Sequence, residues 1–124
     1  MWTLDALQTT AGSSAIPTAT VTLSREGQTF TDAATGDGPV DAIYEAIGRI
    51  TGIRLGLKDY ALRALTSGKD AQGEVTIEVE QDGRKLRARG ISTDIVEASA
   101  RAYLAAVNRV VTTANGARRP AESP

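Results

Sequence analysis

The fold depends on one stretch, Thr35-Gly36-Asp37-Gly38-Pro39-Val40-Asp41-Ala42-Ile43-Tyr44-Glu45-Ala46-Ile47, in which a glycine-rich turn leads directly into a helix. Glycines let the backbone approach another group closely, and Pro39 fixes the backbone of the first helical turn. The first amides of the helix have no partner within the helix. Spacing alone leaves two interpretations open: a turn that holds a small anion, and a tight turn whose glycines are needed for steric reasons only.

Three strands are predicted before this turn. Residues 2–11 alternate apolar and polar side chains until Leu7 disturbs the period, which indicates a strand with a bulge. Residues 18–23 are rich in β-branched side chains, and residues 25–28 have the composition of a hairpin turn that leads into a third strand over residues 29–34. The first half of the chain is therefore expected to be three strands and a helix.

The second half repeats this order. In the first half, apolar residues at helical spacing predict a helix over residues 40–50. The second half then begins with an extended segment over residues 54–66. Residues 74–80 alternate strictly and lead through a hairpin into residues 85–89. A long helical pattern follows, from Ile95 to about Val111.

The two halves also share residues at one constant offset: Gly38, Ile43, Glu45 and Ala46 recur as Gly90, Ile95, Glu97 and Ala98. We therefore predict an α+β fold of internally duplicated βββα units, each an antiparallel three-stranded sheet covered by a helix, related by a pseudo-twofold axis. The predicted domain covers residues 1–114. Residues 115–124 are expected to form a flexible C-terminal tail.

In such a fold the two glycine-to-helix turns converge. Their free amides and helix dipoles favour a carboxylate, and Asp37, Asp41 and Asp94 lie close enough in sequence to take an ammonium group. A pocket for both ends of an amino acid follows from this arrangement. Helix capping is the alternative role of the three aspartates.

The tyrosines allow two interpretations. Tyr60 lies among apolar residues, where a tyrosine can close a small apolar pocket or simply pack in the core. Tyr44 and Tyr103 fall on helical stripes, and we expect both to be packing residues.

The composition restricts the classes of function. Within 124 residues, 14 basic and 15 acidic side chains give a net charge of −1 without a basic cluster, so we expect no nucleic-acid partner. Cysteine and histidine are absent, which excludes thiolate nucleophiles, imidazole bases and the usual zinc ligands. We expect no catalytic residue, no metal site and no cofactor in this domain. The sequence has neither a long apolar run nor a secretory signal, and we expect a cytoplasmic protein without membrane contact.

Several separated motifs resemble the C-terminal regulatory domain of α-isopropylmalate synthase over roughly residues 2–110. They are Ala15-Ile16-Pro17-Thr18-Ala19-Thr20-Val21, Ala34-Thr35-Gly36-Asp37-Gly38-Pro39-Val40-Asp41-Ala42, Gly68-Lys69-Asp70-Ala71-Gln72-Gly73-Glu74, Thr93-Asp94-Ile95-Val96-Glu97-Ala98-Ser99-Ala100-Arg101-Ala102-Tyr103-Leu104 and Asn108-Arg109. The resemblance implies a βββα repeat domain that forms a homodimer and binds L-leucine as a feedback inhibitor. The catalytic barrel of that family, which condenses acetyl-CoA with 2-oxoisovalerate, has no counterpart in this sequence and would be a partner of this domain.

The resemblance also implies which residues surround the effector. The first turn would contribute Gly36, Asp37, Gly38 and Val40. The extended segment would form the apolar wall with Leu57, Tyr60 and Ala64, and the second turn would form the far side with Ile91, Ser92 and Thr93. Some relatives have another residue at the position of Asp37, so its role as a ligand stays open.

Two alternatives stay open beside leucine sensing. One is a structural dimerisation module without a ligand. The other is the isoleucine-sensing domain of a citramalate synthase, because those related enzymes carry a domain similar to the leucine-binding one. Spacing does not separate leucine from isoleucine or valine, because one methylene changes a binding free energy by only about 1–3 kcal/mol.

Overall fold

The computed structural model describes the backbone of residues 1–66, 68 and 71–122, and their side chains as far as residue 112. Two sheets, each followed by a helix, make up the chain. Their elements are β1 (Thr3–Gly12), β2 (Ala15–Arg25), β3 (Gln28–Thr35), α1 (Pro39–Thr51), β4 (Gly56–Ala64), β5 (Gly73–Gln81), β6 (Arg84–Ser92) and α2 (Ile95–Glu122). The predicted α+β fold of duplicated βββα units is confirmed.

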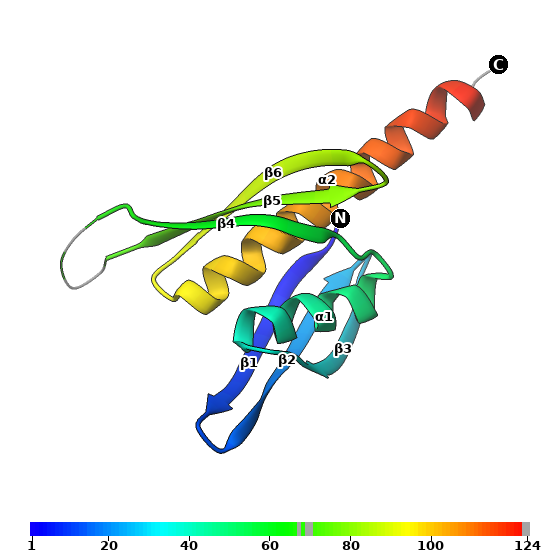
Figure 1. Cartoon of the computed structure of the whole chain (residues 1–124). Coiled ribbons are helices and arrows are strands. Elements are labelled where there is room, and N and C mark those ends of the chain that lie inside the picture. The colour runs from blue at the N-terminus through cyan, green and yellow to red at the C-terminus, as the bar shows by residue number, and fades with distance from the viewer. Residues whose placement is uncertain (67, 69–70, 123–124) are drawn as a thin grey trace.

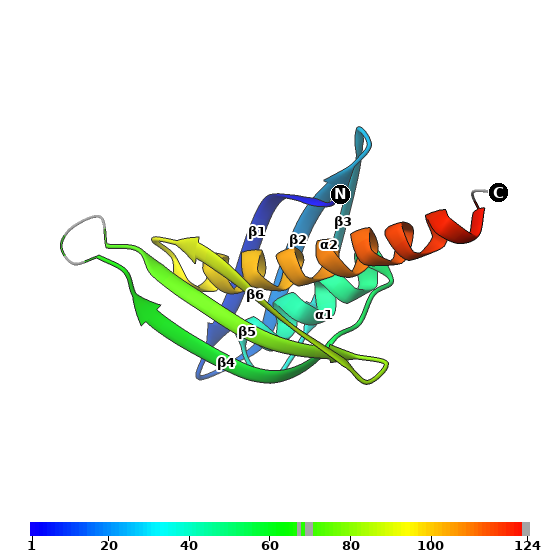
Figure 2. The same cartoon turned by 90° about the horizontal axis from the view of Figure 1, so that it is seen from above.

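Both sheets are antiparallel, with the strand orders β1-β2-β3 and β4-β5-β6. Helix α1 packs on β2 and β3, and helix α2 packs on β5 and β6. The two helices also contact each other, and they lie side by side where the halves meet (Figures 1 and 2). The joint between the halves is therefore built largely from helix surfaces.

The central strands show why the helices pack where they do. In β2 every second residue, from Ala19 to Leu23, is fully buried, and in β5 the same holds from Val75 to Val79. This alternation gives each sheet one apolar face, which the amphipathic helix of the same half covers. Ile43 of α1 is fully buried in the core that results.

The ends of α1 follow from local sequence. Pro39 occupies the first turn, and the Asp41 carboxylate accepts a hydrogen bond from the amide of Asp37 at 2.9 Å. The helix ends at Gly52, whose φ of 75° is left-handed and whose amide donates to the Gly48 carbonyl at 2.9 Å. A glycine adopts this backbone conformation without steric cost.

The structure corrects the register of the internal repeat. Three pairs of equivalent positions are each 56 residues apart: the hairpin residues Glu26 and Asp82, the hairpin glycines Gly27 and Gly83, and the helix starts Pro39 and Ile95. Gly90 therefore corresponds to Ala34, and the predicted pairing of Gly38 with Gly90 is wrong by four residues. Four residues are about one helical turn, so the shifted alignment still matched apolar positions on the same helix face.

One strand bulge recurs in both halves, opposite partner residues that are 56 positions apart. The bulge expected at Leu7 lies slightly earlier, between Leu4 and Ala6, and an equivalent bulge lies between Leu57 and Asp59 in β4. Leu4 pairs with Leu23 and Leu57 pairs with Val79, so both bulges occur at equivalent places.

Helix α2 is longer than predicted. It continues past Val111 to Glu122, so the backbone of the expected tail is helical as far as residue 122, and residues 123–124 lie outside the described part. Asn115 and Gly116 are weak helix formers, but each costs only about 1 kcal/mol or less in a helix interior and does not force a stop. Within the described residues, no helix is long and apolar enough to cross a membrane.

Candidate functional site

A cavity of about 470 Å³ lies where the start of α1 meets β4 of the other half. Its walls combine apolar, aromatic and charged side chains. They are Val40, Leu55 and Leu57, then Tyr44, Tyr60 and Tyr103, and finally Asp41, Glu45 and Arg54. We call it the α1–β4 cavity.

Two local features direct side chains into this cavity. On α1, Val40 and Tyr44 are four residues apart and so lie on one face of the helix. On β4, Leu57 and Tyr60 are three residues apart, a spacing that would place them on opposite faces of a regular strand. The bulge between Leu57 and Asp59 adds one residue, so both side chains join the face of their buried partners on β5.

Three tyrosines form the inner part of the cavity. The rings of Tyr44 and Tyr103 stack with centroids 4.2 Å apart. The Tyr103 hydroxyl accepts a hydrogen bond from the Leu55 amide at 3.0 Å. The Tyr60 hydroxyl lies 2.7 Å from Ser99 Oγ, and the Tyr44 hydroxyl donates to the Ser99 carbonyl at 3.2 Å. Burial raises the pKa of both Tyr44 and Tyr103 above the ordinary tyrosine value, so both rings stay neutral at physiological pH.

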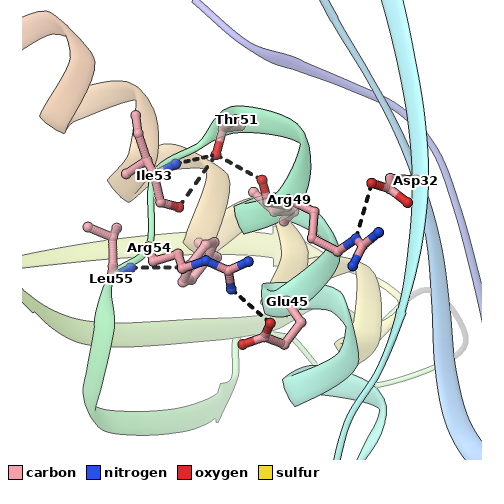
Figure 3. A network of polar contacts seen from close by, with 9 residues as sticks. Asp32, Glu45, Arg49, Thr51, Ile53, Arg54 and Leu55 are labelled. Carbon is pink, nitrogen blue, oxygen red and sulfur yellow. Dashed lines mark hydrogen bonds and ion pairs between the residues drawn. The ribbon is translucent and has the colours of Figure 1, made fainter.

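The mouth of the cavity is charged. Arg54 Nη1 lies 2.8 Å from Glu45 Oε2, and Figure 3 shows Arg54 reaching Glu45 beside Leu55. A side-chain carbon at Gly48 would lie 3.3 Å from Arg54 Cγ, so the glycine leaves room for the arginine stem. About half of the Glu45 and Arg54 side chains is exposed, and both charges can therefore meet a ligand. The site combines an apolar interior with carboxylates and a guanidinium at its entrance.

The structure brings together three of the residues predicted for the effector site: Val40, Leu57 and Tyr60 line the α1–β4 cavity. Gly36, Asp37 and Gly38 form the turn just before it. The other predicted residues are Ala64, Ile91, Ser92 and Thr93, and they lie at or just beyond the opposite end of the second sheet, where Ala64 pairs with Gly73 and Gly73 with Ser92. The single chain does not place this second group at the cavity, and its part in effector binding stays a prediction.

Sequence reasoning missed several lining residues. Glu45, Arg54 and Leu55 were given no role at the site, and Tyr44 and Tyr103 were expected only to pack. The spacing of four residues from Val40 to Tyr44 was the available signal for Tyr44. Tyr103 has no such signal, because it reaches the cavity from the helix of the other half.

Gly36 and Gly38 differ in how much space their surroundings leave for a side chain. A side-chain carbon at Gly36 would lie 2.5 Å from Asp41 Oδ2 and 2.6 Å from the Ala42 nitrogen, so the steric interpretation holds for Gly36. Gly38 is extended, with φ −162°, and no described atom lies within 4 Å of such a carbon. A close approach of ligand to Gly38 stays a prediction.

The pseudo-twofold relation produces a second cavity between α2 and β1, with a volume of about 130 Å³. Five lining positions correspond to positions of the α1–β4 cavity: Leu4, Leu7, Val96, Glu97 and Arg101 are the counterparts of Leu57, Tyr60, Val40, Asp41 and Glu45. Here Arg101 Nε lies 3.4 Å from Glu97 Oε2. A hydrogen bond from Ser92 is the main cause that lowers the pKa of Glu97, and the Arg101 charge acts in the same direction. The equivalent place in the other half is therefore smaller, and each of the two cavities carries an ion pair.

Other parts of the described chain offer less chemistry. Glu74 is buried on the outer face of the second sheet, where Arg63 and Arg89 lie 3.1 and 3.4 Å from its oxygens. This cluster neutralises a buried charge and needs no ligand. Among the described residues, no three acidic side chains are grouped so that they could hold a metal ion.

Comparison with known proteins supports a regulatory domain. Residues 1–111 match the family model described as the LeuA allosteric (dimerisation) domain. The chain is 52% identical over 111 residues to a 2-isopropylmalate synthase of Carboxydothermus hydrogenoformans, and the aligned region covers 89% of this chain and 22% of that protein. The corresponding protein of Heliobacterium modesticaldum is 51% identical over 110 residues with the same coverage, and that of Rhodopirellula baltica is 45% identical over 124 residues, 23% of its length.

The chain spans about a fifth of the length of these relatives. The matched family model is that of the allosteric domain, which confirms the resemblance inferred from the sequence motifs. This chain belongs to the LeuA allosteric (dimerisation) domain family.

Proposed function

We propose that this domain is the regulatory and dimerisation part of a 2-isopropylmalate synthase, and that it binds L-leucine as a feedback inhibitor at a homodimer interface. The catalytic barrel of the parent enzyme would condense acetyl-CoA with 2-oxoisovalerate, and the domain itself would carry no catalytic residue and no cofactor. The absence of cysteine fits a cytoplasmic location. The observation that carries the proposal is the α1–β4 cavity, with its apolar interior and charged mouth.

The interior suits a branched aliphatic side chain. Its volume of about 470 Å³ falls within the range of about 300–1,000 Å³ that is usual for small-molecule sites. Val40, Leu57 and the Tyr60 ring offer apolar contacts. Burying a leucine side chain among such groups contributes about 1.5–3 kcal/mol.

The mouth suits the charged end of an amino acid. The first amides of α1 and its dipole favour a carboxylate by about 0.3–1 kcal/mol, and Arg54 supplies a positive charge nearby. Asp41 and Glu45 supply carboxylates for the ammonium group. An amino acid would therefore find partners for both of its charges within one wall of the cavity.

The exposed inner side of β4 supports a dimer. Among the described residues, α2 packs on β5 and β6 but not on β4. Leu57 is 43% exposed and Leu62 is 54% exposed. A second copy would bury these side chains, and it could bring its own Ala64 and its residues 91–93 toward the cavity. In this arrangement both groups of predicted effector residues would contribute to one site.

Calorimetric titration of the purified chain with leucine tests the proposal. We expect leucine to bind, and Leu57→Ala to weaken binding because it removes part of the apolar wall. Leu4→Ala is the matched control, since Leu4 holds the counterpart position in the smaller cavity, and it should leave the affinity close to that of the wild type. If millimolar leucine gives no heat of binding, the proposal is contradicted. A preference for isoleucine would instead support a citramalate synthase domain, and a stable dimer that ignores all branched-chain amino acids would support a purely structural module.

A further inference from the structure

Ser99 of α2 joins the two halves of the α1–β4 cavity. Its side chain is 0% exposed and stands behind the cavity wall. Ser99 Oγ lies 2.7 Å from the Tyr60 hydroxyl, and the Ser99 carbonyl accepts a hydrogen bond from the Tyr44 hydroxyl at 3.2 Å. Two lining tyrosines from different halves of the fold are thus attached to one residue.

The direction of these hydrogen bonds can be assigned. The Ser99 hydroxyl donates its single proton to the Ile95 carbonyl at 2.9 Å, so it accepts from Tyr60. Tyr44 is the donor to a carbonyl, which has no proton to give. Both tyrosines therefore donate to Ser99, and each hydroxyl proton is committed before a ligand arrives.

This attachment fixes the distance between two walls. Tyr44 belongs to α1 and stacks on Tyr103, whose own hydroxyl is held by the Leu55 amide. Tyr60 belongs to β4, on which α2 does not pack among the described residues, so its hydrogen bond to Ser99 is the main polar link that draws this strand toward α2. If that link is lost, the Tyr60 ring gains rotational freedom while Tyr44 stays in place.

We propose that Ser99 is a positioning residue that sets the width of the α1–β4 cavity and thereby the size of the amino-acid side chain that the cavity selects. This inference rests on the proposed amino-acid binding at that cavity. A site whose walls are held in advance discriminates by shape, because a ligand of the wrong size leaves a gap or causes a clash that the walls do not relax to relieve.

A purely structural role for Ser99 predicts a different result. Losing a buried hydrogen bond would lower the stability of the domain and weaken the binding of all amino acids by a similar factor. A positioning role changes the ratio of affinities between ligands of different size. The ratio of dissociation constants for valine and for the preferred amino acid therefore separates the two roles.

The test is calorimetric titration of the whole chain with leucine, isoleucine and valine, in the wild type, Ser99→Ala, Tyr60→Phe and the double variant. For a difference of one methylene, we expect the wild type to discriminate about tenfold or more. Each single variant should reduce this ratio to about threefold or less, and the double variant should reduce it no further, because both substitutions remove the same hydrogen bond. Thr51→Ala is the matched control, since Thr51 also donates to the carbonyl four residues earlier, at 2.8 Å, but lies at the far end of α1.

The outcomes are distinguishable. If the wild type binds and the ratio is unchanged in Ser99→Ala and Tyr60→Phe, the positioning role is wrong while the proposed function stands. If Ser99→Ala does not fold, Tyr60→Phe decides alone, because it removes only a hydroxyl from a half-buried ring. If the wild type binds none of the three amino acids, both the proposed function and the role of Ser99 are overturned.

Discussion

A close approach of β6 to α2 at Gly90 gives a sharp stability prediction. Gly90 of β6 lies directly under α2, where a methyl carbon would come within 2.6 Å of the Ala102 nitrogen and would also collide with the Ala98 carbonyl. Both obstacles are helix backbone, which cannot rotate away as a side chain can. Gly90→Ala should therefore push α2 off the sheet rather than be absorbed locally.

The expected loss follows from the size of that shift. Carbon atoms normally rest about 3.5–4.0 Å from their neighbours, so the helix has to move by roughly 1 Å. A gap of about 0.5–1 Å removes a quarter to a half of the dispersion energy of the contacts that it opens, and insertion of a methyl into a packed core costs about 1–3 kcal/mol. We expect a loss near 3 kcal/mol in the free energy of unfolding, a large part of the 5–15 kcal/mol that is usual for a domain.

Urea denaturation followed by circular dichroism, at one fixed protein concentration, measures this loss. Two glycine variants serve as controls. Gly12→Ala meets no described atom within 4 Å and should change the free energy by less than about 0.5 kcal/mol. In Gly73→Ala the added methyl group meets the flexible end of the Ile95 side chain, so its loss in the free energy of unfolding should lie between those of Gly12→Ala and Gly90→Ala. A Gly90→Ala domain within about 0.5 kcal/mol of the wild type would refute the reasoning, as would an equal loss in Gly12→Ala.

Three further predictions follow from the cavity and from the end of α1. Burial raises the pKa of Tyr44 and Tyr103 above the unfolded value of about 10, so the free energy of unfolding should be constant below that pH and fall as the pH rises from there toward the folded values. Denaturation between about pH 9 and pH 12 should show the onset of the fall, and Tyr44→Phe should reduce it. Calorimetry should give one leucine per chain, because the counterpart cavity measures only about 130 Å³ against about 470 Å³ for the α1–β4 cavity, and a stoichiometry near two would contradict this. Gly52→Ala should lower the free energy of unfolding by about 1–2 kcal/mol without changing leucine affinity, since only the left-handed φ of 75° requires the glycine.

The order of elements could be predicted because each is encoded locally. Alternating side chains specify strands such as β5, and the Glu26-Gly27 and Asp82-Gly83 turns both have positive φ, which favours their hairpins. The repeat register could not be fixed in the same way, because a helical pattern looks similar after a shift of one turn. The end of α2 was missed because propensity is a weak guide to where a helix stops.

The cavity could be predicted only in part, because it forms between the halves. Tyr60 stood out as an aromatic residue among apolar ones on an extended segment, whereas Leu57 and Val40 were indicated only by the family resemblance. Tyr103 was expected to be a core residue, which is correct, since it is 2% exposed. Its second role depends on Leu55, which arrives from a distant part of the chain, and no pattern within one element indicates such a meeting.

The two cavities show how a duplicated fold acquires one site. Their shared positions place a valine and an acidic residue from a helix against two residues of a strand from the other half, so the backbone alone provides two equivalent places. The side chains then make them differ. Where the first cavity has Glu45, the second has Arg101, which pairs with Glu97. Where the first has Tyr60, bonded to Ser99, the second has Leu7, whose side chain has no polar group for an equivalent hydrogen bond. Selectivity for one ligand per chain would therefore depend on these substitutions rather than on the fold, and exchanging Glu45 and Arg101 should alter binding at the first cavity without disturbing either sheet.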